Sequence, residues 1–206
     1  MTLKILGRVT SINVRKVLWA ADELGLGYER EDWGQPMRDP KVPEFLALNP
    51  NGQVPVLIDG DLVLWESNAI LIYLAEKTGM LLPQDLPGRG LALQWLIWQG
   101  TELNPPWGYA LNALVRKTPG FNDADKLADS IARWSRVMLI LEAQLADGTP
   151  YVAGASFSIA DIAIGLSVHR WMMTPFEKPA MRGVEAYYGR LKARAAGQAW
   201  MGAGTP

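Results

Sequence analysis

Polar side chains that could do chemistry stand where predicted strands give way to predicted helices. Ser11 and Asn13 follow the first strand, and both side chains can donate a hydrogen bond. Glu66 and Ser67 follow a later strand, and a helix begins at Ser67. A helix N-terminus attracts anions through its free N–H groups and its dipole. A serine at such a position is also an ordinary helix cap, so both roles stay open for Ser11 and Ser67.

The composition excludes several classes of site. The chain has 206 residues, 49% of them hydrophobic, and a formal net charge of −1, which is typical of a globular protein without a nucleic-acid footprint. It has no cysteine, which excludes disulfides, zinc thiolates and a cysteine nucleophile. His169 is the single histidine, so we expect no metal site and a packing role for that ring. Short apolar runs and an N-terminus unlike a signal peptide predict a cytoplasmic protein without a membrane span.

Residues 1–78 have the pattern of an α/β unit. The predicted elements are a strand at 2–6, a helix from Asn13 to Gly25, an edge strand at 28–33, a Pro-rich loop at 34–43, a short apolar piece, strands VPVLI and LVLW, and a helix from Ser67 to about Lys77. The dipeptide Asp59-Gly60 suits the positive φ angles of a tight hairpin turn.

The chain changes character after residue 78. Residues 79–90 hold two prolines and three glycines, which indicates a linker, and the apolar residues of 91–206 fall at helical spacing. Within "SFSIADIAIG", Ser158 and Asp161 have the spacing of a capping box, which satisfies both side chains. We therefore interpret this pair as structural, and residues 91–206 as an all-helical domain.

Three motifs carry a resemblance over nearly the whole chain. "NPNGQVPVL" with "LWESNAILIYL", followed by "FSIADI", resembles the cytosolic glutathione S-transferases. "SINVRKV" is similar to their serine-type, bacterial theta-like or beta-like branch. The first tyrosine is Tyr28, in a predicted strand, which disfavours the tyrosine-type branch, and the cysteine-type branch is excluded by composition. The resemblance implies a thioredoxin-like α/β domain at 1–78, a linker at 79–90 and an all-α domain at 91–206.

The resemblance also implies glutathione as co-substrate, with no tightly bound cofactor. Its proline at Pro55 has a cis peptide bond, so that the main chain of Val54 pairs with the cysteinyl unit of glutathione. Ser67 would hold the γ-glutamyl carboxylate, Glu66 would face the ammonium group, and Gln53 would be a further contact. Charged loop residues could reach the glycyl carboxylate or be merely solvated, namely Arg38 and Lys41.

The chemical step needs glutathione as thiolate. A cysteine thiol has a pKa of about 8.5, and lowering it by about two units takes about 2.7 kcal/mol. A hydrogen bond donated to sulfur, together with a helix N-terminus, can supply that stabilisation. Ser11 is our first candidate donor and Asn13 our second.

The electrophile is the part that the sequence leaves open. Aromatic residues could line an apolar pocket held between the domains, or belong to the core, namely Trp33, Trp107, Tyr109 and Trp171. We predict a homodimeric transferase that joins glutathione to a small, largely apolar electrophile in detoxification, without a nucleic-acid partner. A glutathione-dependent peroxidase, dehalogenase or isomerase would use the same thiolate, and a non-catalytic glutathione-binding or ligand-binding protein would keep the same fold.

Overall fold

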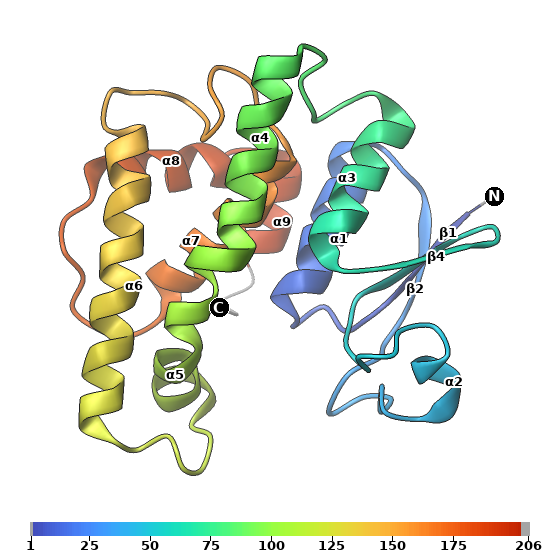
Figure 1. The fold of residues 1–206 in the computed structure, drawn as a ribbon, viewed down its shortest axis with the longest axis horizontal. Coiled ribbons are helices and arrows are strands. Elements are labelled where there is room, and N and C mark those ends of the chain that lie inside the picture. Colours follow the sequence, from blue (N-terminus) through green and yellow to red (C-terminus); the bar gives the residue numbers. More distant parts are fainter. Residues whose placement is uncertain (1, 203–206) are drawn as a thin grey trace. The chain divides into compact units, whose positions relative to one another are not determined.

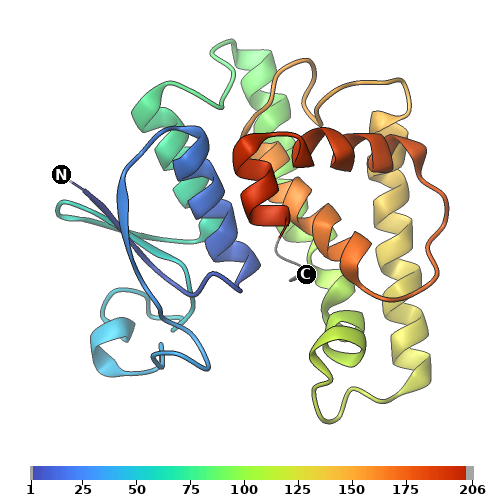
Figure 2. The same cartoon turned by 180° about the vertical axis from the view of Figure 1, so that it is seen from behind.

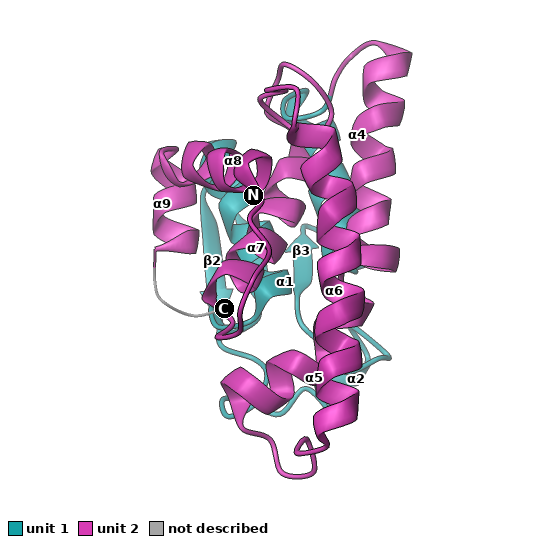
Figure 3. Cartoon of the chain, turned by 90° about the vertical axis from the view of Figure 1, so that its left-hand side faces the viewer, with its two compact units in different colours: residues 1–82 teal, residues 83–206 magenta. Residues whose placement is uncertain are grey.

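The computed structural model describes residues 2–202 and divides into two compact units (Figure 3). Unit 1 comprises residues 1–82 and unit 2 residues 83–206, so the division falls inside the stretch 79–90 that the sequence suggests as a linker. Unit 1 is α/β and unit 2 is helical. The predicted fold class is thereby confirmed.

A four-stranded mixed sheet forms the centre of unit 1 (Figure 1). Its strands are β1 (Leu3–Leu6), β2 (Tyr28–Glu31), β3 (Val56–Asp59) and β4 (Leu62–Trp65), in the order β2-β1-β3-β4. Strands β1 and β2 are parallel, whereas β3 runs antiparallel to both β1 and β4. Strand β2 lies at an edge, as its acidic sequence predicts.

Two long helices lie side by side on one face of this sheet (Figures 1 and 2). They are α1 (Ile12–Glu23) and α3 (Ser67–Thr78), and a short helix α2 (Pro43–Leu46) lies between β2 and β3 in the chain. The apolar residues at helical spacing on α1 and α3 are fully buried, namely Val14, Val17, Leu18, Ile70, Leu71 and Leu74. A second core cluster joins Phe45 of α2 to Leu6, Trp33 and Val56. Apolar side chains therefore pack on the sheet in two clusters.

The β3–β4 hairpin turns one residue later than the sequence suggests. Asp59 pairs with Leu62, so the two turn residues are Gly60 and Asp61. Of these two, only Gly60 has a positive φ, 62°. A glycine in the first turn position is the requirement of a type II′ hairpin. The glycine therefore fixes this turn, and Asp59 belongs to the strand.

Helices build the described part of unit 2. They are α4 (Leu86–Trp98), the π-helix η1 (Gln99–Leu103), the 3-10 helix η2 (Pro105–Trp107), α5 (Gly108–Leu111), the π-helix η3 (Asn112–Arg116), α6 (Ala124–Leu145), α7 (Ile159–Met173), α8 (Arg182–Lys192) and α9 (Ala195–Met201). Every residue of α7 from Ile159 to Trp171 is buried, and α4 and α8 pack against that helix. Helix α7 is therefore the core of the unit. No helix in the described range 2–202 is long and apolar enough to cross a membrane.

Helix α4 begins inside the stretch 79–90 rather than after it. The Asp85 carboxylate caps it by accepting from the Gly88 N–H at 2.8 Å. Pro87 stands in the first turn, where its missing N–H has no intrahelical partner to lose. Residues 79–90 have the composition of a linker, but the cap at Asp85 starts a helix within them at Leu86.

The predicted capping box of α7 is present and has further partners. The Asp161 carboxylate accepts from the Ser158 N–H at 2.8 Å and from the Ser158 hydroxyl at 3.0 Å. It also accepts from the Val152 N–H at 2.9 Å and the Tyr187 hydroxyl at 3.0 Å. Burial raises the pKa of this carboxyl, against the opposing effect of its hydrogen bonds. Asp161 therefore ties α7 to α8 and to the preceding loop.

Candidate active site

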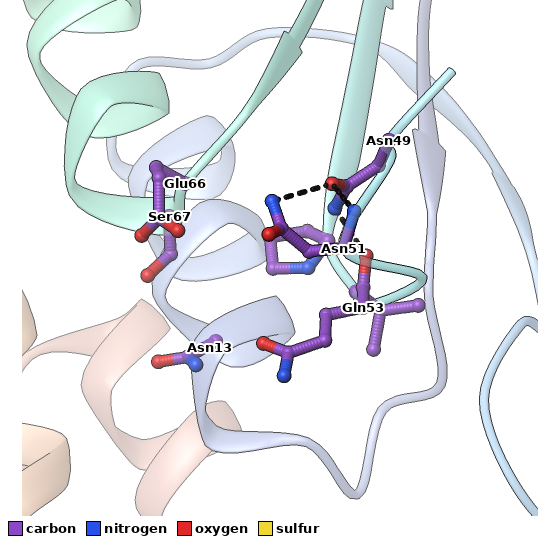
Figure 4. A pocket seen from close by; sticks show the side chains of 8 residues that line it. Asn13, Asn49, Asn51, Gln53, Glu66 and Ser67 are labelled. Atoms are coloured by element: carbon purple, nitrogen blue, oxygen red, sulfur yellow. Dashed lines mark hydrogen bonds between the residues drawn. The ribbon is translucent and has the colours of Figure 1, made fainter. Parts of the chain in front are cut away.

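A small polar pocket lies in unit 1 beside the first turn of α3 (Figure 4). Its wall combines side chains from α1, from the loop before β3 and from the start of α3. The lining residues are Asn13, Asn49, Asn51, Gln53, Val54, Pro55, Glu66 and Ser67. The fold therefore brings together Asn13 and all five residues that the two hairpin motifs supply as candidates for binding glutathione.

The loop before β3 forms one wall of the pocket. The Val54–Pro55 peptide bond is cis, and β3 begins at the next residue, Val56. Gly52 has a φ of 58°, and an added Cβ there would lie 2.9 Å from the carbonyl oxygen of Pro40. A side chain at this position would meet both a strained backbone and a steric clash. The motif therefore needs its glycine for the course of the chain.

Glu66 and Ser67 form the opposite wall, and their roles at the helix start differ from the sequence expectation. Glu66 is in the cap position with φ 73° and ψ 107°, and Ser67 is the first residue of α3. The alternative role of Ser67 as the helix cap is therefore wrong. A positive φ is uncommon for a residue other than glycine, and such strain concentrates at functional sites. Glu66 is exposed and Ser67 is buried, so the carboxylate and the hydroxyl have different access to solvent.

Two asparagines that the sequence analysis did not select hold the pocket loop in shape. Asn49 is buried, and its Nδ2 donates to the Gln53 carbonyl at 2.7 Å. Its Oδ1 accepts from the Asn51 N–H and from Asn51 Nδ2, both at 3.0 Å. An asparagine that bonds the main chain two residues later is an Asx turn, which the spacing in "NPNGQ" permits. Figure 4 shows this amide cluster beside the pocket.

The structure distinguishes the two candidate thiol donors. Asn13 lies in the first turn of α1, and its amide faces the pocket near Ser67 and Gln53 (Figure 4). Ser11 occupies the cap position of α1, but its side chain makes no capping hydrogen bond. The hydroxyl is thus not used by the helix, yet Ser11 is not among the described residues that line the pocket. Asn13 therefore has the better placement.

The two loop cations have different surroundings. Arg38 Nη1 donates to Glu31 Oε2 at 2.7 Å, and its guanidinium lies 5.4 Å from the centre of the Trp33 ring. Hydrogen bonds from Lys4 and Trp33, with the charge of Arg38, lower the pKa of the Glu31 carboxyl. Lys41 Nζ instead donates to the Asn51 carbonyl at 2.8 Å. Lys41 therefore lies beside the pocket loop, whereas Arg38 is held by a carboxylate on β2.

Two of the four aromatic candidates for an electrophile pocket lie in cores. Trp33 is 9% exposed and packs on Phe45 with ring centres 4.9 Å apart. Trp171 is 1% exposed and meets Trp134 edge-on. Both rings fill the apolar interior of their units, so neither is available as a pocket wall. The other two candidates are half-buried, namely Trp107 and Tyr109.

Those two rings, and the single histidine, have defined neighbours. The Arg170 guanidinium lies 4.3 Å from the centre of the Trp107 ring. The Tyr109 hydroxyl accepts from the Asp123 N–H at 2.9 Å. His169 is 1% exposed, and its Nδ1 lies 2.8 Å from the Tyr188 hydroxyl. His169 accordingly has the buried packing position that its surroundings in the sequence suggest.

Comparison with known proteins identifies the family. Residues 1–76 match the family model of the glutathione S-transferase N-terminal domain. Glutathione S-transferase GstB of Escherichia coli is 36% identical over 198 residues, which cover 86% of this chain and 95% of that protein. The chain belongs to the glutathione S-transferase family. The resemblance to this family drawn from "NPNGQVPVL" and "LWESNAILIYL" is thereby confirmed.

Solved glutathione S-transferases extend the similarity to both units. The theta class glutathione S-transferase of Xanthomonas axonopodis pv. citri, solved with glutathione bound, has a TM-score of 0.91 and 36% identity, and the match covers 97% of each chain. A different activity is named for one relative, the disulfide-bond oxidoreductase YfcG of Escherichia coli. It is 34% identical over 76% of this chain and 75% of its own length.

Proposed function

We propose that this glutathione transferase binds reduced glutathione in the polar pocket of unit 1 and activates its thiol for attack on an electrophile. The observation that carries the proposal is the pocket itself, which gathers hydrogen-bonding groups from three separate segments of the sequence. A family member with similar structure has been solved with glutathione bound, which supports the same ligand here. Glutathione serves as co-substrate in this account, and its reduced pool places the enzyme in the cytoplasm.

The γ-glutamyl end fits the start of α3. The hydroxyl and N–H of Ser67 would donate to its carboxylate, and the free N–H groups of the first turn would add their dipole. The exposed Glu66 carboxylate would face the ammonium group as a charge-assisted partner. The main chain of Val54 would pair with the cysteinyl unit, and the side chain of Gln53 would contact the peptide from the same wall.

The glycyl carboxylate is assigned to Lys41 in preference to Arg38. Lys41 is exposed and lies beside the pocket loop, where its ammonium group donates to the carbonyl of Asn51. The Arg38 guanidinium already pairs with Glu31 and would have to leave that carboxylate to reach a ligand. Binding glutathione through Lys41 therefore costs less rearrangement of existing contacts.

Thiol activation is assigned to Asn13, with Ser11 as a second donor. The thiol releases its proton to solvent, and hydrogen bonds donated to sulfur stabilise the thiolate that remains. A hydrogen bond to a charged group contributes about 1.5–3 kcal/mol, and about 2.7 kcal/mol lowers a thiol pKa by about two units. The thiolate then forms the S–C bond as the leaving group departs. Positioning and thiol activation together account for the catalysis, without a covalent enzyme intermediate.

The second substrate is proposed only by class. An apolar electrophile needs aromatic contacts, and half-buried Trp107 and Tyr109 stay candidates for that role. A role in detoxification follows from such a substrate. The same thiolate would serve a peroxidase, dehalogenase or isomerase, and a disulfide substrate deserves equal testing because YfcG is named for that chemistry.

A homodimer is part of the proposal. Strand β4 leaves Leu62, Val63 and Trp65 exposed, and α6 leaves Leu139 and Ile140 exposed. Apolar side chains of this kind are suited to an interface in which the hairpin of one subunit meets the long helices of the other. Light scattering coupled to size-exclusion chromatography measures the mass directly, and a monomer at micromolar concentration would contradict this part.

Retention on immobilised glutathione, followed by parallel turnover assays, tests the function. The assays use an aryl halide, a hydroperoxide and a small disulfide, each with glutathione. Retention with aryl-halide conjugation supports the transferase assignment. Turnover of the hydroperoxide or the disulfide alone replaces it with the corresponding redox activity. Retention without any turnover favours a non-catalytic binding protein, and absence of both contradicts the proposal.

A further inference from the structure

We propose that Lys16 positions the γ-glutamyl carboxylate of glutathione, as a buried cation set behind Ser67. This inference rests on the proposed function, because it names a residue that acts on the same bound ligand. The sequence analysis did not select Lys16. Its ammonium does not line the pocket and would act through the Ser67 hydroxyl, so it is a positioning residue.

Lys16 lies in the layer immediately behind the pocket wall. It is three residues after Asn13 on α1, which places the two side chains on the same face of the helix in successive turns. Asn13 reaches the pocket, whereas Lys16 is only 1% exposed. Its Nζ donates to Asn68 Oδ1 at 3.1 Å and to Ser67 Oγ at 3.5 Å. The cation therefore meets the first turn of α3 at Ser67, which lines the pocket.

Two physical terms oppose a cation at this position. Removing an ammonium group from water costs free energy, which its hydrogen bonds offset. The N-terminus of a helix also carries the positive end of its dipole, which repels a cation. The attraction of a carboxylate bound at the same helix end would offset both terms. A lysine at this position is therefore suited to an anionic ligand at the start of α3.

The hydrogen-bond chemistry gives the lysine a direct effect on Ser67. An ammonium group only donates, so Ser67 Oγ must accept from it. The hydroxyl proton of Ser67 is then free to point into the pocket and to donate to a carboxylate. A donor chain from Lys16 through Ser67 strengthens the second bond, because the cation polarises the hydroxyl. We therefore expect Lys16 to strengthen binding of the γ-glutamyl carboxylate and to have little effect on binding of the rest of the tripeptide.

The test compares two ligands that differ only in that carboxylate. Glutathione and γ-aminobutyryl-cysteinylglycine are titrated by calorimetry into the wild-type protein and into Lys16→Met, Lys16→Gln and Lys16→Arg. Lys77→Met is the matched control, because it removes a lysine from the other end of α3 that pairs with Asp59. Circular dichroism and thermal unfolding show which variants are folded. Two neutral variants are included so that one that fails to fold does not decide the outcome.

We expect the wild-type protein and the Lys77→Met variant to prefer glutathione over the analogue. The neutral variants should lose about tenfold or more in affinity for glutathione and little for the analogue. Lys16→Arg should keep most of the preference. Folded neutral variants that keep the preference, or that lose affinity equally for both ligands, would overturn the role of Lys16 and leave the proposed function standing. Failure of the wild-type protein to bind glutathione would instead overturn the proposed function.

Discussion

Replacing Asn13 with alanine should raise the pKa of the thiol of bound glutathione. Asn13 is the pocket-lining side chain at the start of α1, where it faces the same space as Ser67 and Gln53. Alanine is a better helix former than asparagine, so the substitution should leave α1 intact. The change therefore removes one hydrogen-bond donor from the site with little effect on the fold.

The size of the effect follows from one lost hydrogen bond to a charged acceptor. Such a bond contributes about 1.5–3 kcal/mol, and about 1.36 kcal/mol corresponds to one pKa unit. The thiol pKa should therefore rise by about one to two units. For a wild-type thiol pKa of about 6.5, the thiolate fraction at pH 7 would fall by about threefold to twenty-fivefold.

The assay is the ultraviolet absorbance of the thiolate in the enzyme–glutathione complex, titrated against pH. The dependence of kcat on pH should show the same shift, because the reactive form is the thiolate. Calorimetry establishes that glutathione still binds, and Ser11→Ala is measured in parallel. An unchanged titration in Asn13→Ala would refute the assignment. A shift in Ser11→Ala alone would return the role to the residue that the sequence ranks first.

Four further outcomes follow from the described contacts. Gly52→Ala should cost about 1–2 kcal/mol of stability from its left-handed backbone and weaken glutathione binding, since the new Cβ would lie 2.9 Å from a carbonyl oxygen; thermal unfolding and calorimetry measure both, and unchanged values would contradict it. Asp161→Ala should cost about 3 kcal/mol or more in urea unfolding, because it leaves several buried donors without an acceptor. Because the pKa of Asp161 is raised, the folded state holds this proton more tightly than the unfolded state does. The contribution of this group to stability therefore falls as pH rises from about 3.9 through the raised folded pKa. Asp161→Asn should remove that dependence of stability on pH. Lys41→Met should weaken glutathione binding more than Arg38→Met, and calorimetry showing the reverse order would move the glycyl carboxylate to the arginine.

Much of the fold was accessible from sequence because its signals are local. Helical spacing of apolar residues predicts α1 and the helical character of residues 91–206, and the spacing of Ser158 and Asp161 predicts the start of α7. The hairpin register was not accessible in the same way. Asp59-Gly60 and Gly60-Asp61 both offer a glycine, and only the pairing of Asp59 with Leu62 decides between them. Register depends on contacts across strands, which one segment does not specify.

The pocket-lining residues are predictable where they belong to one contiguous motif. They are less predictable at the start of a helix, where neighbouring side chains point in different directions. "NGQVP" and "WES" supply six pocket-lining residues in two short runs. Ser11 and Asn13 are only two residues apart, but Ser11 is the extended cap residue and Asn13 lies in the first turn of α1, and of the two only Asn13 lines the pocket. The burial of Lys16 is not predictable from the sequence, because lysine is rarely buried and its neighbouring residues do not indicate it. Trp171 was a candidate for the electrophile pocket and lies in a core. The sequence does not distinguish these positions, because an aromatic residue suits both.

Amide chemical shifts of the labelled wild-type protein during a glutathione titration test the central claim most directly. We expect saturable shifts concentrated in unit 1, at Asn13, at residues 51–54 and at Ser67, at glutathione concentrations in the micromolar to millimolar range. The absence of saturable shifts at millimolar glutathione, or shifts confined to unit 2, would contradict it.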